Sequence, residues 1–234
     1  MIKRRKRMTF DTVTDTGGKL DRMRNTPKFE FVREYVDGAD VLNIGCWTGA
    51  FESLVADSAA RVTAVDIEPC ALEVASRNVP GARFEEASVL SLPFEDSSFD
   101  LVTMWETLEH LPEGSEPKAL TEIARVLKPG GRFALSTPSA HLLSRLLDPA
   151  WFVAGHRHYS APDVTSLLTG AGLAVERMES RGSLAVVADY MCLYIWKWIL
   201  RRPMPERDSF TRAFLKSYSR RGFVTLFAVA SRSK

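Results

Sequence analysis

The chain has 234 residues, a length that suits one domain with an added segment better than two independent domains. Its composition, 45% hydrophobic and 26% charged, is that of a globular protein, and a net charge of +2 is too small to indicate nucleic acid as a partner. The cysteines, Cys46, Cys70 and Cys192, have neither metal-ligand nor paired spacing, so we expect them to be reduced, in a cytoplasmic protein.

The N-terminal residues 1–38 begin with a run of cations, KRRKR at positions 3–7. The polar stretch from Met8 to Asp21 lacks the apolar core that a secretory signal needs, so we do not expect export. Two interpretations of the run stay open, a solvated arm and a contact with an anionic membrane or nucleic acid. We expect residues 1–38 to form a basic arm and a lid helix.

Short β-like runs alternate with amphipathic helical patterns over residues 39–178. We predict strands at 40–44, 61–66, 82–86, 99–104, 131–136 and 173–178, and helices at 50–58, 69–78, 115–127 and 161–170. Strands separated by such helices require right-handed crossovers and a mostly parallel sheet with helices on both faces. A β-branched run within 223–234 predicts an antiparallel last strand, inserted at the edge. The expected fold is α/β, a Rossmann-like open sheet of seven strands.

Residues 179–222 separate the last two strands by more than a hairpin needs, and we interpret them as a helical insertion. The apolar run at 184–200 is short for a membrane span and contains Asp189 and Lys197. Residues 201–222 carry seven cations and two anions. Two interpretations stay open: an anchor at a membrane interface, or a helix buried against the sheet or in a dimer contact. Aromatic side chains typical of a membrane interface are Tyr190, Tyr194, Trp196 and Trp198.

The sequence VLNIGCWTGAF at 41–51 places two glycines, Gly45 and Gly49, directly after the first predicted strand. In an open parallel sheet, ligands bind at the carboxyl ends of the strands. The second strand ends in Asp66, about 20 residues further on, where an acidic residue can hold both hydroxyls of a ribose. This arrangement favours a nucleotide-bearing ligand, although a glycine pair alone is weak evidence.

Three further segments follow in register: SVLSLPF at 88–94, SSFDLVTMWETLEHLP at 97–112 and ALTEIARVLKPGGRFALSTP at 119–138. Together with the glycine loop and the strand that ends in Asp66, they resemble class I methyltransferases that use S-adenosylmethionine, over residues 39–178. The resemblance implies S-adenosylmethionine as the cofactor and methyl transfer as the activity. Residues 39–178 would then be the cofactor-binding core.

The resemblance also implies roles for single residues. Gly45 and Gly49 match the loop against the methionine part of the cofactor, Asp66 the residue that holds the ribose, and Ile67 the apolar neighbour beneath adenine. Ser88 stands where the family usually has an aspartate that bonds the adenine amino group. The full set of expected cofactor residues is Asn43, Gly45, Cys46, Trp47, Gly49, Asp66, Ile67, Ser88, Val89, Met104 and Trp105.

The first motif departs from the family pattern at two positions. Asn43 replaces an acidic residue, and this removes a charge that could pair with the ammonium of the cofactor. Trp47 replaces the middle glycine of the loop, and we interpret its ring as a wall of the site.

Glu109 and His110 are the first candidates for catalysis. The pair resembles one in ubiquinone-pathway O-methyltransferases that is associated with catalysis and a divalent cation. A base or metal role and a structural role, with His110 capping the short helix, stay open. We assign no metal site, because two ligands do not make one.

The segment GHRHYS at 155–160 holds the remaining candidates, His156, His158 and Tyr159. Similar stretches occur in methyltransferases of cell-surface polysaccharide or lipid-head-group pathways. These side chains either contact the acceptor or act as base, or they are simply polar surface.

The leading hypothesis is therefore an S-adenosylmethionine-dependent methyltransferase that acts by in-line transfer on an oxygen of a small acceptor, lipid- or sugar-linked. The insertion would cover the acceptor, contact the inner face of the membrane or form a homodimer. The alternative from another class is a non-catalytic cofactor-binding or scaffold protein. A nucleic-acid methyltransferase is a third reading, against which the sequence lacks an Asn/Asp-Pro-Pro-Tyr signature.

Overall fold

The computed structural model describes residues 19–148, 155–201 and 208–233. The basic run at 3–7 lies outside the described residues. The side chains of Tyr194, Lys197 and Trp198 are also outside the description, so the expectations placed on them stay predictions.

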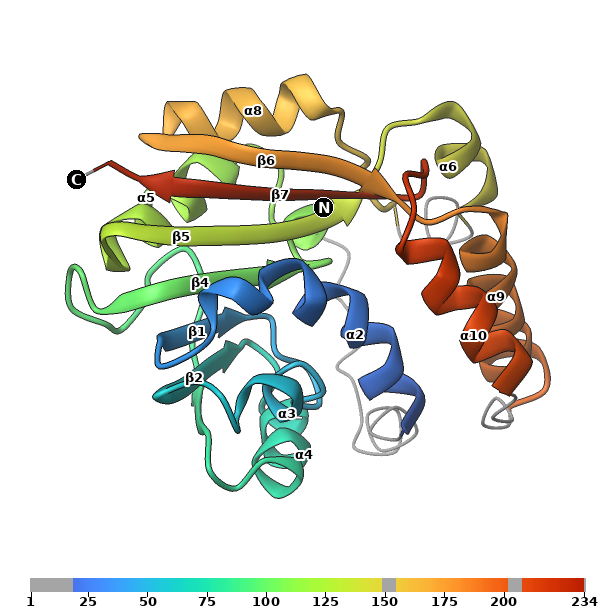
Figure 1. Cartoon of the computed structure of the whole chain (residues 1–234), viewed down its shortest axis with the longest axis horizontal. Helices are drawn as coiled ribbons and strands as arrows, with labels where there is room; N and C mark the ends of the chain where they lie inside the picture. The colour runs from blue at the N-terminus through green and yellow to red at the C-terminus, as the bar shows by residue number, and fades with distance from the viewer. Residues whose placement is uncertain (1–18, 149–154, 202–207, 234) are drawn as a thin grey trace, which may run out of the picture.

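A seven-stranded sheet forms the centre of the molecule (Figure 1), with the strand order β3-β2-β1-β4-β5-β7-β6. Strands β1 to β5 are parallel to one another, and β7 pairs antiparallel with both β5 and β6. The expected open α/β sheet with an antiparallel last strand is confirmed, and β7 lies one strand in from the edge. The strands are β1 (Asp40–Ile44), β2 (Arg61–Asp66), β3 (Arg83–Glu86), β4 (Phe99–Trp105), β5 (Leu127–Pro138), β6 (Leu173–Arg181) and β7 (Thr225–Arg232).

Helices cover both faces of the sheet because its central strands are buried on both sides. Leu42 and Val102 belong to a core with α5 (Glu116–Val126) and α8 (Ala161–Gly170). Val41 and Leu101 belong to the opposite core, with α2 (Lys19–Val32) and α3 (Glu52–Val55). Alternate residues of one strand thus feed different cores, as the pleat requires. Helix α4 (Pro69–Asn78) packs beside β2 and β3.

Two elements differ most in length from their predictions, and β6 extends three residues past its predicted end. The helix expected at 50–58 is the short α3, because turns occupy the residues on either side of it. Strand β5 begins at Leu127 and not at residue 131, because Leu127 already pairs with Phe99 of β4 before an irregular stretch that includes Gly130 shifts the register. There a Cβ on Gly131 would lie 2.8 Å from the Lys128 carbonyl oxygen, so the backbone approach requires glycine.

The insertion contains α9 (Leu184–Tyr194), the π-helix η3 (Ile195–Ile199) and α10 (Asp208–Tyr218). Together with α2, these helices lie beyond the carboxyl ends of β1, β4 and β5, at the right of Figure 1. A charge pair joins them: Arg24 Nη2 on α2 lies 2.8 Å from Oδ2 of the buried Asp189 on α9. The short helices are α6 (Leu142–Leu147), η1 (Arg33–Tyr35) and η2 (Leu108–His110). Within the described ranges, no helix combines the length and apolar content needed to cross a bilayer.

Candidate active site

The glycine loop after β1 is held in a shape that its glycines alone permit. Gly45 and Gly49 have φ values of +78° and +80°. A Cβ on Gly45 would collide with Thr107, and one on Gly49 would lie 3.2 Å from Ala75. Trp47 between them also has a positive φ, +49°, and packs against Ala71 and Val74 of α4. The loop therefore keeps its backbone close to the sheet edge and accommodates the tryptophan by packing it on α4.

Asp66, at the end of β2, fastens this loop. Its Oδ2 accepts a hydrogen bond of 2.9 Å from the Trp47 backbone N–H, and its Oδ1 accepts one of 3.1 Å from Glu68. Burial raises the pKa of Asp66, while the bonds from Trp47 and Glu68 oppose the rise. The residue expected to hold a ribose thus lies beside the glycine loop, as the strand order requires.

Asn43 lies buried beneath the loop in a network that the sequence did not predict. Its Nδ2 donates to Glu52 Oε1 at 2.6 Å, and its Oδ1 accepts from Thr103 Oγ1 at 2.8 Å. Glu52 is buried, and this burial raises its pKa to about 7. The carboxyl group that is missing at position 43 is therefore supplied by Glu52, from the first turn of α3.

The residues expected around adenine meet at the ends of β2 and β3. Asp66 pairs with Glu86 across the two strands, which brings Ile67 and Ser88 to the same edge of the sheet. Ile67 is 53% exposed, so it offers an open apolar surface. Ser88 Oγ accepts from Leu90 N–H at 3.2 Å, and Val89 is buried in the core. This edge is compatible with the expected adenine site.

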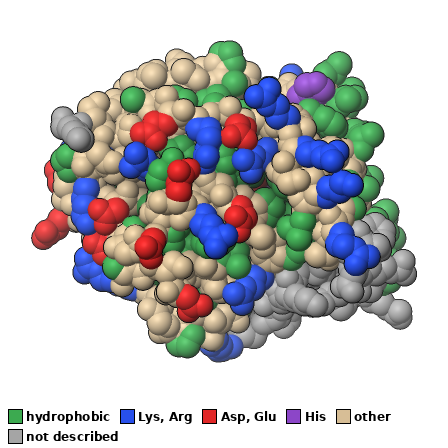
Figure 2. All heavy atoms as spheres, viewed as in Figure 1, with side chains coloured by type: hydrophobic (Ala, Val, Ile, Leu, Met, Phe, Trp, Pro, Cys, Tyr) green, Lys and Arg blue, Asp and Glu red, His purple; other side chains and the backbone are tan. Residues whose placement is uncertain are grey.

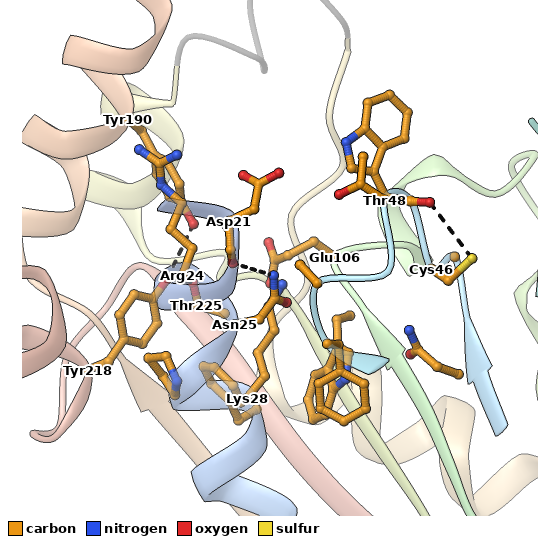
Figure 3. Close-up of a pocket in the computed structure, with 18 residues that line it drawn as sticks. Asp21, Arg24, Asn25, Lys28, Cys46, Thr48, Glu106, Tyr190, Tyr218 and Thr225 are labelled. Carbon is orange, nitrogen blue, oxygen red and sulfur yellow. Dashed lines mark hydrogen bonds between the residues drawn. The ribbon is translucent and has the colours of Figure 1, made fainter. Parts of the chain in front are cut away.

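A cavity of about 210 Å³ opens between the glycine loop, α2 and the insertion (Figure 3). The expected cofactor residues on its wall are Asn43, Gly45, Cys46, Trp47 and Trp105. Burial raises the pKa of the Cys46 thiol, so this cysteine stays protonated. Met104, the expected cofactor residue next to Trp105 on β4, lies fully buried in the core.

The far wall of the cavity is polar, and it comes from five distant parts of the chain. Lys28 reaches in from α2 toward Glu106, which follows β4 (Figure 3). Tyr190 of α9 and Tyr218 of α10 approach within 3.5 Å at their hydroxyls, and Tyr218 bonds Thr225 of β7 at 2.9 Å. Burial lowers the pKa of Lys28 although carboxylates surround it, and burial raises the pKa values of both tyrosines.

Glu106 and Glu109 separate to opposite sides of β5. Glu106, held at a φ of +50°, accepts a bond of 2.6 Å from Ser136 Oγ and lines the cavity. Glu109 accepts one of 3.1 Å from the next residue, Thr137, and is not among the described residues on the cavity wall. Burial and the neighbouring Glu106 raise the pKa of Glu109. The structure therefore presents Glu106 to the cavity, whereas the sequence pointed to Glu109.

His110, His156 and His158 lie near η2, and none of them is among the described residues on the cavity wall. The rings of His110 and His156 lie 4.6 Å apart, edge to face. His158 Nε2 lies 3.3 Å from Asp148 Oδ2, and His156 Nδ1 lies 3.6 Å from the same oxygen. The catalytic roles expected for the histidines stay predictions.

Arg157 and Tyr159 connect this segment to η2. Arg157 donates to the carbonyl oxygens of Leu108 at 3.1 Å and Leu111 at 2.6 Å, and pairs with Glu116. The hydroxyl of the buried Tyr159 donates to Glu116 at 2.9 Å. These contacts fix the position of η2, a task that the sequence pattern did not reveal. The catalytic role expected for Tyr159 also stays a prediction.

The charges around the cavity suit the methionine end of the cofactor that the resemblance implies. S-adenosylmethionine carries a sulfonium and an ammonium group, both of which need nearby negative charge when they leave water. Oε2 of the buried Glu52 has no hydrogen-bond partner among the described residues. Asp21 and Glu106 place carboxylates on the wall, whereas Glu52 and Asp66 lie behind it, bonded to the lining residues Asn43 and Trp47. Glu52, Asp66 and the loop backbone would hold the cofactor.

The comparisons with known proteins point to a methyltransferase that uses S-adenosylmethionine. Residues 42–135 match the family described as "Methyltransferase domain". A Mycolicibacterium smegmatis protein named as a probable S-adenosylmethionine-dependent methyltransferase is 33% identical over 139 residues, 59% of this chain and 53% of that protein. The mitochondrial ubiquinone biosynthesis O-methyltransferase of Schizosaccharomyces pombe is 36% identical over 148 residues, 57% of this chain and 52% of that protein.

A solved structure shares the fold over most of the chain. It is an S-adenosylmethionine-dependent methyltransferase from Mesorhizobium loti, with a TM-score of 0.64 and 18% identity over 90% of this chain and 100% of that one. The chain spans about half the length of the two relatives above. The family match at 42–135 includes the glycine loop and the strand that ends in Asp66. Over residues 42–135 the chain is similar to methyltransferases that use S-adenosylmethionine, as the resemblance in sequence implied.

Proposed function

We propose that the chain transfers a methyl group from S-adenosylmethionine to an oxygen atom of a small acceptor that is lipid- or sugar-linked. The observation that carries this proposal is Glu106, a carboxylate on the cavity wall between the glycine loop and the tyrosine pair Tyr190–Tyr218. The similarity to an O-methyltransferase of ubiquinone biosynthesis supports oxygen as the acceptor atom.

The residues divide the work between binding and proton transfer. When bound, the cofactor supplies a methyl group whose carbon bonds the acceptor oxygen as its bond to sulfur breaks, with the electron pair left on sulfur. Glu106 takes the proton of the acceptor hydroxyl, and Ser136 keeps the carboxylate oriented. Lys28 and the two tyrosines position the acceptor, and α2 and α9 exclude water from the cavity.

The catalytic roles that the sequence suggested for Glu109, His110, His156, His158 and Tyr159 stay predictions, and this proposal assigns the proton transfer to Glu106. Glu109 lies behind Glu106, and η2 carries both Glu109 and His110. A protein that works at the inner face of a membrane, or as a homodimer, is also part of the proposal. The names of the relatives indicate neither membrane contact nor dimerisation. Either contact would use the outer face of the insertion.

The test measures S-adenosylhomocysteine release from S-adenosylmethionine with a panel of hydroxylated lipids, quinone precursors and sugars. Turnover with one class, lost in Glu106→Gln, is the expected result. Cofactor binding in calorimetry without turnover across the panel would favour the scaffold alternative. RNA binding that weakens with salt would favour a nucleic-acid substrate.

A further inference from the structure

The outer face of α9 and η3 carries an unbroken stripe of exposed apolar side chains. Its members recur at intervals of three or four residues, as one face of a helix requires. Ile199 is 73% exposed and Leu184 is 60% exposed, values far above those of ordinary core residues. We call this set the apolar stripe: Leu184, Ala188, Met191, Ile195 and Ile199.

Helix α6 adds four exposed leucines beside the start of this stripe. Leu142 is 67% exposed, and Leu143, Leu146 and Leu147 are exposed as well. Ser144 anchors the helix by donating to the Val224 carbonyl oxygen at 3.0 Å. Val224 also packs against Gly182, just before α9, so α6 and the start of α9 meet at one residue. An exposed apolar surface of this extent marks a binding face.

Cations flank the apolar surface. Arg212, Lys216 and Arg220 follow one another at four-residue intervals along α10 and just past its end, and all three are exposed. No carboxylate of the described residues forms an ion pair with any of them. In Figure 2, Lys and Arg side chains over α10 lie next to the hydrophobic side chains that line the edge where α6 and α9 lie.

We infer that this face docks on an anionic lipid bilayer, with the stripe and the α6 leucines in the interfacial layer and the α10 cations on the headgroups. An apolar helix face beside unpaired cations is the pattern of an interfacial helix. A second copy of the chain is a poorer occupant, because the exposed residues described for α6, α9 and α10 include no carboxylate that could pair with the cations of the other copy.

The opposite side of α9 faces the cavity. Tyr190 lines the cavity wall, while Met191, the next residue, belongs to the stripe. One helix therefore separates the proposed bilayer face from the proposed acceptor site, which gives a lipid-linked acceptor a short path. This last step rests on the proposed function, whereas docking does not.

The test is co-sedimentation of the full chain with vesicles of phosphatidylcholine containing phosphatidylglycerol, against pure phosphatidylcholine, at low and high salt. We expect partitioning at least tenfold stronger on the anionic vesicles. Met191→Glu/Ile195→Glu should lower it tenfold or more. Arg212→Gln/Lys216→Gln should lower it severalfold and remove most of its salt dependence. Arg77→Gln/Arg83→Gln, exposed cations at the other end of the sheet, should bind as the wild type does.

Equal binding by the wild type and the stripe variant would overturn the inference, as would absence of binding to anionic vesicles. A dimer in sedimentation equilibrium that the stripe variant abolishes, without vesicle binding, would assign the face to a second copy instead. The assay contains no acceptor and requires no turnover. Its failure would leave the proposed methyl transfer untouched, and a failure of methyl transfer would leave docking untouched.

Discussion

The two walls of the cavity are built in different ways. The cofactor wall is lined mainly by residues 43–51, and they belong to a contiguous segment, 43–66, in which β1, the glycine loop, α3 and β2 follow one another. Strands β1 and β2 lie side by side in the sheet. The acceptor wall brings together α2, the end of β4, α9, α10 and β7, segments that are far apart in sequence. Backbone geometry fixes the first wall, whereas packing of separate helices assembles the second. Substitutions should therefore change cofactor affinity on one side and turnover or helix docking on the other.

The largest expected effect is on the acceptor wall, at Glu106. Glu106→Gln keeps the size of the side chain but cannot take a proton, so kcat should fall about 1,000-fold, within the range that general base catalysis supplies. Cofactor affinity, measured by calorimetry, should stay within about twofold, since the cofactor wall is unchanged.

The matched control is Glu109→Gln, because Glu109 bonds Thr137 away from the cavity. We expect a loss in kcat of about tenfold or less from this change, by comparison with the usual range for a catalytic base. A larger loss from Glu109→Gln than from Glu106→Gln would restore the assignment that the sequence pattern favoured.

Assembly of the acceptor wall should depend on the pair between α2 and α9. Arg24→Met leaves the buried Asp189 without this cation, so the free energy of unfolding should fall by about 3 kcal/mol. Chemical denaturation measures this loss, and Arg24→Met/Asp189→Asn should recover part of it. Arg33→Met, which removes an exposed pair with Glu30, should cost about 0.5 kcal/mol or less. Equal losses from the two single variants would mean that the α2–α9 pair does not hold the wall together.

On the cofactor wall, the largest effect is expected at Asp66. Asp66→Ala removes the acceptor for the Trp47 and Glu68 N–H groups as well as the predicted ribose contact. The affinity for S-adenosylhomocysteine should fall about 100-fold, the equivalent of two charge-assisted hydrogen bonds. Asp57→Ala, at an exposed position after α3, changes the same charge and should leave binding intact. An unaffected affinity in Asp66→Ala would place the ribose elsewhere.

The sequence predicted most of the fold because each strand of the parallel part is a short apolar run followed by its own helix. Strands β1 and β2 have the predicted bounds, and only local turn chemistry shortened α3 and lengthened β5. The sheet order and the place of β7 inside the edge depend on contacts between distant residues, which the residue pattern alone did not specify.

The candidate site divides in the same way. The glycine loop and Asp66 were predictable because the residues and their spacing lie within one contiguous segment. The sequence did not show which of Glu106 and Glu109 faces the cavity. That orientation depends on the left-handed backbone at Glu106 and on the opposite directions of the Ser136 and Thr137 side chains on β5. Glu52 looked like an ordinary acid in the first turn of a helix, where such residues are common. Asn43 could have indicated the role of Glu52. An amide in place of the usual acidic residue beneath the loop suggests that another carboxylate lies nearby.

The smallest expected effect tests that replacement through its pH dependence. The pKa of Glu52 is raised to about 7 in the folded protein, so between the usual carboxyl pKa and 7 the folded state binds more protons than the unfolded state. This group therefore lowers the stability of the free protein as pH rises through that window.

A cationic ligand beside Glu52 reverses this tendency, because it favours the ionised carboxylate and lowers its pKa in the complex. Binding then releases a proton below pH 7, so the affinity for S-adenosylhomocysteine should rise as pH increases from about 5.5 and level off above about 7. Calorimetry in buffers of different ionisation enthalpy measures both the affinity and the proton release. Glu52→Gln should bind about tenfold more weakly at pH 7.5 and lose the slope, whereas Asn43→Asp/Glu52→Gln should recover affinity with the acid back at position 43. An identical pH profile in the wild type and in Glu52→Gln would show that the buried carboxylate serves the network with Asn43 and Thr103 and has no part in holding the ligand.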